Sequence, residues 1–366
     1  MAYKFRGTTA TAAPAAATTA SRWVVGSAVQ FVGYAANSDL TSWTFYDRIG
    51  DGSPDAIDVA YGKDASGNGI YCMTNDSSNK EVSISSADVT DGNAWTHIDL
   101  DSGANDQLVI AWAERSTGTA AGVWVTVGKQ DSNKSYYRSL DGGANWSEIS
   151  LNGITGHTTD RITALAADGT GKWMMAQNDR IYYSTDDAAS FSLAHTLSGE
   201  NITRITGMAF TNNSWVISYE RSTASSKTFL RSCASSDVTT WSSEGGGTDG
   251  NGATLSNYGS SNIGRTTIVT YEGRILIVPH NRQRAGFADI SGTTISNFET
   301  VNMNISSANK NMRDAATDGT TWLICGQDGY IWKSADNAES WAIAATSIRN
   351  STDDMQCVTG DVYLPQ

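Results

Sequence analysis

The chain is poor in several residue types that would point to particular functions. Among 366 residues it has only 4 prolines, 4 cysteines and 4 histidines, and its net charge is −13. No apolar run approaches the roughly 18 residues of a membrane-spanning helix, so we predict no membrane span. Proteins that grip phosphates need a basic face, and the densest basic segment is Arg282 to Arg284. We therefore predict no direct nucleic-acid binding.

The cysteines and histidines do not form a metal-binding pattern. No two cysteines are spaced as C-x-x-C, and Cys72, Cys325 and Cys357 lie in apolar, strand-like segments. Such cysteines behave as small buried hydrophobic residues. The four histidines are isolated from one another, whereas a metal site needs ligands at close spacing. We predict no metal and no cofactor.

What the chain does contain is a repeated phrase that ends in an aromatic residue. Three copies share one register, in which Ser is followed by Asp two residues later and by an aromatic five residues after that. Their residues are Ser139, Asp141, Gly143 and Trp146; Ser184, Asp186 and Phe191; and Ser334, Asp336 and Trp341. Looser copies end at Trp43, Trp95 and Trp241, and a degenerate one ends at Phe298. A repeat of about fifty residues in a β pattern predicts a propeller.

Each repeat reads as four antiparallel strands. In residues 161–197, apolar segments at 162–167, 172–177 and 181–184 are separated by turn residues, and a fourth segment begins at Phe191. The segments 56–100, 107–151, 204–245, 265–303 and 312–346 follow the same plan. Four antiparallel strands form one propeller blade, so these segments predict six complete blades.

A seventh blade is predicted from the two ends of the chain. Residues 23–27, 30–34 and 43–46 supply three strands, and residues 355–358 supply the fourth. Pairing the ends removes sheet edges that would otherwise promote aggregation. We predict an all-β fold, a single seven-bladed propeller over residues 22–366. Because Phe298 is a weak marker, six or eight blades stay open.

The repeated Ser and Asp residues are interpreted as structural. Their side chains accept hydrogen bonds from nearby backbone N–H groups and so stabilise tight turns, and Gly143 can adopt the positive φ that such turns need. The aromatic residue is expected to pack between neighbouring blades. We therefore assign no catalytic role to these carboxylates.

The phrase Ser-x-Asp-x-Gly-x-x-Trp resembles the Asp-box (BNR repeat) of sialidase-type β-propellers and their many non-sialidase relatives. That resemblance implies the fold and not an activity, since the box lies on blade turns away from the central face. A sialidase would need three arginines, a Tyr–Glu pair and an acid/base Asp. Its first arginine usually lies in an Arg-Ile-Pro phrase, and the nearest segment here, from Arg48 to Gly50, lacks the Pro. Related enzymes that cleave glucans use two propellers, and this chain has room for one. The prediction is that the protein is not an enzyme.

Residues 1–21 differ in composition from the rest of the chain. They comprise a short charged and aromatic start followed by a Thr/Ala tract with Pro14, which is too polar for the apolar core of a secretion signal. We expect an extended arm that lies on a partner subunit. Tyr3 and Phe5, alternating with Lys4 and Arg6, would form a two-faced anchoring strand.

A second partner-binding candidate is the segment that contains Arg282 and Arg284. It follows the apolar residues 275–279, so we expect an exposed loop that could bind an anion or an acidic partner, with a solvated turn as the alternative.

These features favour a structural protein of a tailed-phage particle, located in the virion. The composition and the resemblance to propellers of phage tail nozzles and hubs point to a spacer or a receptor-facing module. The implied partners are other virion proteins reached through the arm, further copies in a symmetric homo-oligomer, and a host-surface glycan or receptor. Two alternatives stay open: a glycan- or protein-binding propeller of cellular origin, and a glycoside hydrolase with a divergent site.

Overall fold

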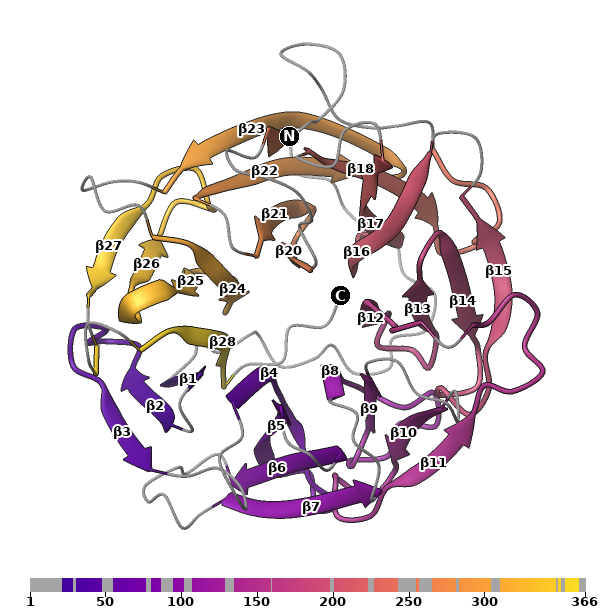
Figure 1. Cartoon of the computed structure of the whole chain (residues 1–366), viewed down its shortest axis with the longest axis horizontal. Coiled ribbons are helices and arrows are strands. Elements are labelled where there is room, and N and C mark those ends of the chain that lie inside the picture. The colour runs from indigo at the N-terminus through magenta and orange to yellow at the C-terminus, as the bar shows by residue number, and fades with distance from the viewer. Residues whose placement is uncertain are drawn as a thin grey trace, which may run out of the picture.

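The computed structural model describes residues 22–28, 31–47, 55–76, 80–86, 95–101, 107–128, 135–158, 160–197, 201–222, 227–242, 255–256, 265–280, 283–303, 310–346, 348–349 and 353–361. These residues form seven sheets of four antiparallel strands, arranged in a ring around a central axis (Figure 1). The fold is an all-β, seven-bladed propeller, as the sequence predicts.

The blades are numbered along the chain, from the inner strand outward. Blade 1 contains β28 (Met355–Gly360), β1 (Arg22–Ser27), β2 (Phe31–Ala36) and β3 (Thr44–Asp47). Blade 2 contains β4 (Asp55–Lys63), β5 (Gly69–Asp76), β6 (Lys80–Ser86) and β7 (Trp95–Asp101). Blade 3 contains β8 (Gln107–Ala113), β9 (Val123–Gly128), β10 (Ser135–Ser139) and β11 (Ser147–Ser150). Blade 4 contains β12 (Ala164–Ala167), β13 (Trp173–Gln177), β14 (Arg180–Ser184) and β15 (Ser192–Thr196).

The remaining three blades follow the same order. Blade 5 contains β16 (Ile202–Thr211), β17 (Ser214–Arg221), β18 (Lys227–Ala234) and the short β19 (Leu255–Ser256). Blade 6 contains β20 (Thr266–Tyr271), β21 (Arg274–Pro279), β22 (Arg284–Ser291) and β23 (Thr294–Asn302). Blade 7 contains β24 (Met312–Thr317), β25 (Trp322–Gly326), the 3-10 turn η3 (Gln327–Gly329), β26 (Ile331–Ser334) and β27 (Ala342–Ala345).

The ring closes through the two ends of the chain. Strand β28 pairs antiparallel with β1, with Val358 opposite Val25 and Gly360 opposite Trp23. The backbone amide of Asp361 extends this pairing by donating to the carbonyl of Arg22, at 3.1 Å. The predicted split blade is therefore confirmed. The predicted arm over residues 1–21, with Tyr3, Lys4, Phe5 and Arg6, lies outside the described residues.

The hydrophobic core lies in the seams between blades. The second strands are mostly apolar, and β13, β21 and β25 are buried along their whole length, because each of their faces packs against a neighbouring blade. Five tryptophans with no exposed surface lie on second strands: Trp23, Trp124, Trp173, Trp215 and Trp322. The fourth strands form the outer wall, and most residues of β23 are exposed or half-buried.

The antiparallel order gives the ring two different faces. The hairpins between first and second strands and the turns between third and fourth strands lie together on one face, which we call the turn face. The second hairpins and the links between blades lie on the opposite face, which we call the link face. Each inner strand runs from the link face to the turn face, and this direction locates every side chain discussed below.

One copy of the repeated phrase is absent from the fold. Phe298 lies inside strand β23, which follows β22 through a tight hairpin with Ser291 opposite Thr294. Gly292 adopts a φ of 56° in that hairpin, so no longer turn is needed. The prediction that a seventh copy ends at Phe298 was wrong, although the blade it marked exists.

Candidate functional site: the central channel and the blade seams

The inner strands of all seven blades line a central channel with a volume of about 330 Å³. The part near the turn face is lined by aromatic, aliphatic and threonine side chains, including Tyr61, Trp112 and Phe210. Charged side chains gather at the start of the inner strands, near the link face: Asp58, Arg265 and Asp314. The channel is therefore apolar at one end and ionic at the other.

Arg265 crosses the channel at its ionic end. It precedes β20 in blade 6, and its guanidinium lies 2.9 Å from the carboxylate of Asp58 on β4 in blade 2. Its Nη1 also donates to the carbonyl of Ile57 at 3.2 Å. Because blades 7 and 1 lie between these two blades in the ring, the contact joins opposite sides of the channel (Figure 1).

The two channel carboxylates also bind backbone groups of the next blade. Asp58 accepts from the amides of Val59, at 3.1 Å, and Ile110, at 3.0 Å. Asp314 accepts from the amide of Val358 at 3.0 Å and from the Thr267 hydroxyl at 2.5 Å. Each carboxylate therefore connects its own inner strand to a neighbouring inner strand by hydrogen bonds.

The environment of Asp314 favours its protonated form. Burial, reinforced by the negative charge of Asp58, raises the pKa of Asp314 from 3.8 to about 6. The exposed fraction of this residue is only 3%. A buried carboxyl group with a raised pKa beside a channel is a feature that binding and catalytic sites share with structural networks.

His280 belongs to the same network. Its ring lies 3.1 Å from the Thr267 hydroxyl, and its backbone amide donates to the carbonyl of Arg265. Burial and the charges of Arg265 and Arg313 hold the pKa of His280 well below its usual value. His280 itself is half-buried and continues the pairing with the inner strand. Arg284 is half-buried at the start of β22, opposite Asn302, while Arg282 lies outside the described residues.

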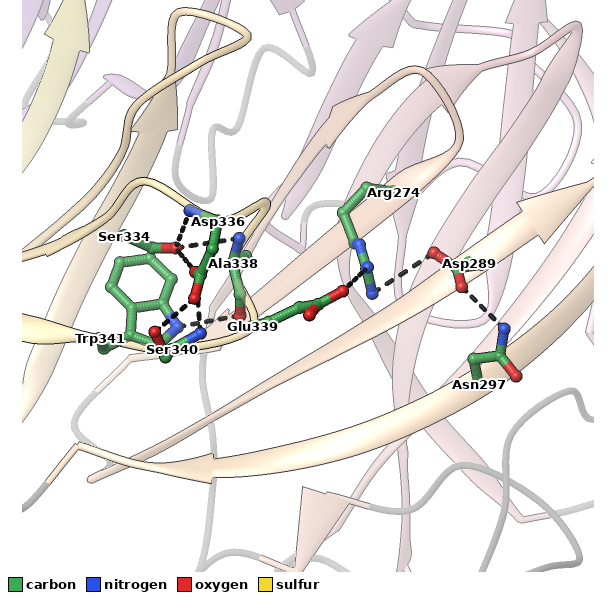
Figure 2. Close-up of polar contacts among 9 residues, drawn as sticks. All are labelled: Arg274, Asp289, Asn297, Ser334, Asp336, Ala338, Glu339, Ser340 and Trp341. Carbon is green, nitrogen blue, oxygen red and sulfur yellow. Dashed lines mark hydrogen bonds and ion pairs between the residues drawn. The ribbon is translucent and has the colours of Figure 1, made fainter.

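On the turn face, the three full copies of the repeated phrase share one set of contacts. The Ser hydroxyl donates to the Asp carboxylate and accepts the amide four residues ahead, as in Ser334 with Asp336 and Ala338 (Figure 2). The Asp carboxylate accepts the amide four residues beyond itself, as Asp336 does from Ser340. Ser139 with Asp141 and Ser184 with Asp186 repeat the pattern. The same Ser hydroxyls also accept the amides two residues ahead, at 3.4–3.5 Å, so each turn combines a two-residue contact with a four-residue contact.

In four copies of the phrase the tryptophan is held by its own hydrogen bond. The indole Nε1 of Trp341 donates to the carbonyl three residues earlier, at 3.1 Å, and that of Trp146 does so at 2.8 Å. Trp43 and Trp241 keep this bond, at 2.8 and 3.1 Å, although their turns lack the full Ser–Asp pair. These four tryptophans share the bond, whereas the Nε1 of Trp95 has no hydrogen-bond partner within the described residues.

The phrases also join neighbouring blades. Phe191 in blade 4 packs edge-on against Tyr136 in blade 3, with ring centroids 5.3 Å apart, and the Tyr136 hydroxyl donates to the carbonyl of Ala188. Asp187 accepts from the amide and the hydroxyl of Ser116 in blade 3. The prediction that the aromatic packs between blades is confirmed for this copy.

The seam between blades 6 and 7 carries an ion-pair network. Arg274 at the start of β21 lies 2.8 Å from Glu339 in the turn of blade 7 and 3.3 Å from Asp289 on β22 (Figure 2). Asn297 on β23 donates to the other oxygen of Asp289 at 2.8 Å. The guanidinium of Arg274 also lies 4.8 Å from the ring centre of Phe287. The turn of one blade thus neutralises an arginine of the blade before it.

The sequence interpretation found the turn residues and missed the channel cluster. The signal available was an Asp beside small apolar residues within each inner strand, Asp58 before Val59 and Ala60 and Asp314 before Ala315 and Ala316. Nothing in the sequence connects either residue to Arg265, which is far away in the chain.

Two further observations limit the kind of site present. None of the helical structure in the described ranges has the length and hydrophobicity of a membrane span. Over those same ranges, no three His, Cys, Asp or Glu side chains are grouped so that they could hold a metal ion.

Comparison with known proteins identifies the fold but neither a family nor a function. No family model and no curated protein matches the sequence. Solved propellers do match, among them a functionally unknown protein from Desulfotomaculum acetoxidans, with a TM-score of 0.58, 10% identity and coverage of 92% of this chain and 98% of that one. YCF48 from Cyanidioschyzon merolae matches with a TM-score of 0.51, 15% identity and coverage of 79% and 84%. A structure described as YCF48 bound to D1 peptide matches at 0.50, with 16% identity and coverage of 79% and 81%.

Proposed function

We propose that this chain is a non-catalytic propeller of the Asp-box type that acts as a rigid module for binding protein partners. The observation that carries the proposal is the Arg265 cluster at the end of the channel. Every carboxylate oxygen of Asp58 and Asp314 accepts from a protein group, and the acceptors link separate blades. Carboxylates engaged in this way hold a ring together and leave little capacity for substrate.

The requirements of a glycoside hydrolase site also favour a non-catalytic role. Such enzymes need one carboxylic acid and one carboxylate that both reach the substrate. Asp58 and Asp314 are 7% and 3% exposed, and the Arg265 guanidinium spans the space beside them. The raised pKa of Asp314, about 6 as burial and Asp58 set it, is the one feature that favours the hydrolase alternative, so the test must include it.

The finer proposal is a structural role in a tailed-phage particle. It depends on the composition and on residues 1–21, which we propose tie the propeller to a neighbouring subunit in a symmetric assembly of the virion. The peptide-bound relative shows that a propeller of similar shape can hold a polypeptide, and this supports a protein partner in general. The alternative of a cellular glycan- or protein-binding propeller shares the fold and differs in the partner.

Deletion of residues 1–21 tests the role in assembly. We expect the full chain to form a discrete oligomer by multi-angle light scattering, and the truncated chain to be a monomer with an unchanged far-UV spectrum. A full chain that is monomeric at all concentrations, or a truncated chain that still assembles, would refute the arm as the assembly element.

Turnover of fluorogenic glycosides tests the non-catalytic part separately. We expect no turnover by the wild type above that of a blank. Turnover that disappears in Asp314→Asn while the protein stays folded would overturn the proposal in favour of the hydrolase.

A further inference from the structure

The seam between blades 3 and 4 has arginines without a dedicated acidic partner. Arg138 on β10 points toward blade 4, since Tyr136, two residues earlier on the same face of the strand, contacts that blade. The buried Nε of the Arg138 guanidinium has no hydrogen-bond partner within the described residues. Arg115, in the first hairpin of blade 3, has one ion pair, a long contact of 3.9 Å to Asp187.

The seam between blades 6 and 7 provides an internal comparison (Figure 2). There the third strand contributes Asp289 and the turn of the next blade contributes Glu339, so that Arg274 lies between two carboxylates. In the other seam the third strand contributes Arg138, and alignment of the two phrases from Ser334 and Ser184 puts Ala189 where Glu339 stands. The seam between blades 3 and 4 thus presents two arginines, with Ala189 in the position that Glu339 takes in the other seam.

The acidic residues near Arg115 and Arg138 do not fully take the place of Asp289 and Glu339. Asp187 lies in this seam, and both of its oxygens already accept from Ser116. Asp186 is engaged by Ser184 and by Ser190 within its own turn. Burial, together with the positive charge of Arg115, lowers the pKa of Arg138 despite these neighbouring carboxylates. A partly buried cation without a partner is unfavourable unless an external anion supplies one.

We propose that Arg115 and Arg138 form a binding site for a doubly charged oxyanion, a sulfate or phosphate group, on the turn face between blades 3 and 4. Two guanidinium groups offer two positive charges and several N–H donors in planar forks, which match tetrahedral oxyanions. The exposed position of Ala189 leaves the site open where Glu339 closes its counterpart. The proposal does not depend on the role of the chain in a particle.

Isothermal titration calorimetry with sodium sulfate and with inorganic phosphate, at constant ionic strength in chloride, tests the site. We expect one anion to bind per wild-type chain and the affinity to fall at least 10-fold in Arg138→Gln. Ala189→Glu should weaken binding equally, because it supplies the internal carboxylate of the other seam without removing an arginine. The anion that binds more tightly identifies the group as sulfate or phosphate.

Ala144→Glu is the matched control. Ala144 occupies the same place in the first copy of the phrase, is exposed like Ala189, and lies in a turn with no corresponding arginine pair. The Ala144→Glu variant should bind sulfate and phosphate as the wild type does. The proposal fails if the wild type binds neither anion, or if Ala189→Glu and Ala144→Glu bind equally well.

Discussion

Replacing Asp314 by Asn should stabilise the propeller, and more so at alkaline pH. The raised pKa means that the folded protein binds a proton more tightly than the unfolded chain does. The stability contributed by Asp314 therefore falls as the pH rises from 3.8 toward 6, and the full penalty applies above that range. Asn imitates the protonated carboxyl group at every pH, so it removes the penalty.

The size of the effect follows from the pKa difference. A rise from 3.8 to about 6, at roughly 1.4 kcal/mol per pKa unit, corresponds to about 3 kcal/mol of unfolding free energy at pH 8. At pH 5 the same relation gives about 1–2 kcal/mol, because Asp314 in the folded protein is then largely protonated. Asn can keep the local contacts: its oxygen can accept from the Val358 amide, and its NH₂ can donate to the Thr267 hydroxyl.

Urea unfolding at pH 5 and pH 8, followed by tryptophan fluorescence, measures the difference between wild type and Asp314→Asn. The variant should be the more stable protein at both pH values, with a gap that is about 1–2 kcal/mol wider at pH 8 than at pH 5. Asp99→Asn, which removes an exposed carboxylate, controls for the lost charge and should give a constant gap. A gap for Asp314→Asn that does not change with pH would refute the assigned environment, and a large destabilisation would show that the carboxylate itself is required.

Three further predictions concern the turns and the thiols. Ser184→Ala should lower the unfolding free energy by about 1–3 kcal/mol, since the buried hydroxyl that accepts the Ala188 amide is lost; an unchanged urea midpoint would contradict this. Trp341→Phe should cost about 1–3 kcal/mol by leaving the Ala338 carbonyl without its indole donor, and because Phe occupies this place in the second copy, calorimetry should still show a single cooperative transition. All four cysteines are buried, and burial raises the pKa of each thiol; a thiol reagent should label none in the native protein and four in urea, so rapid native labelling would contradict the packing.

The sequence was a good guide wherever one blade determines its own structure. The Ser–Asp phrases form turns from contacts that span four residues, as in Ser334 with Ala338. Strand order and the count of seven followed from the recurrence of such turns, and even the looser copy at Trp43 keeps its indole bond. The error at Phe298 has a local cause, since a two-residue hairpin replaced the longer turn in that blade.

Only the closed ring decided what lies in the channel and the seams. Asp58 and Arg265 are remote in the chain and meet because blades 2 and 6 face each other across the axis. Ala189 and Glu339 look like unimportant positions of one phrase until the preceding blade brings arginines beside them. Local hydrogen bonds and alternating burial depend only on residues close together in the chain, so the sequence alone determined the blades. The pairing of charges depends on distances set by all seven blades together, so the tertiary structure alone decided it.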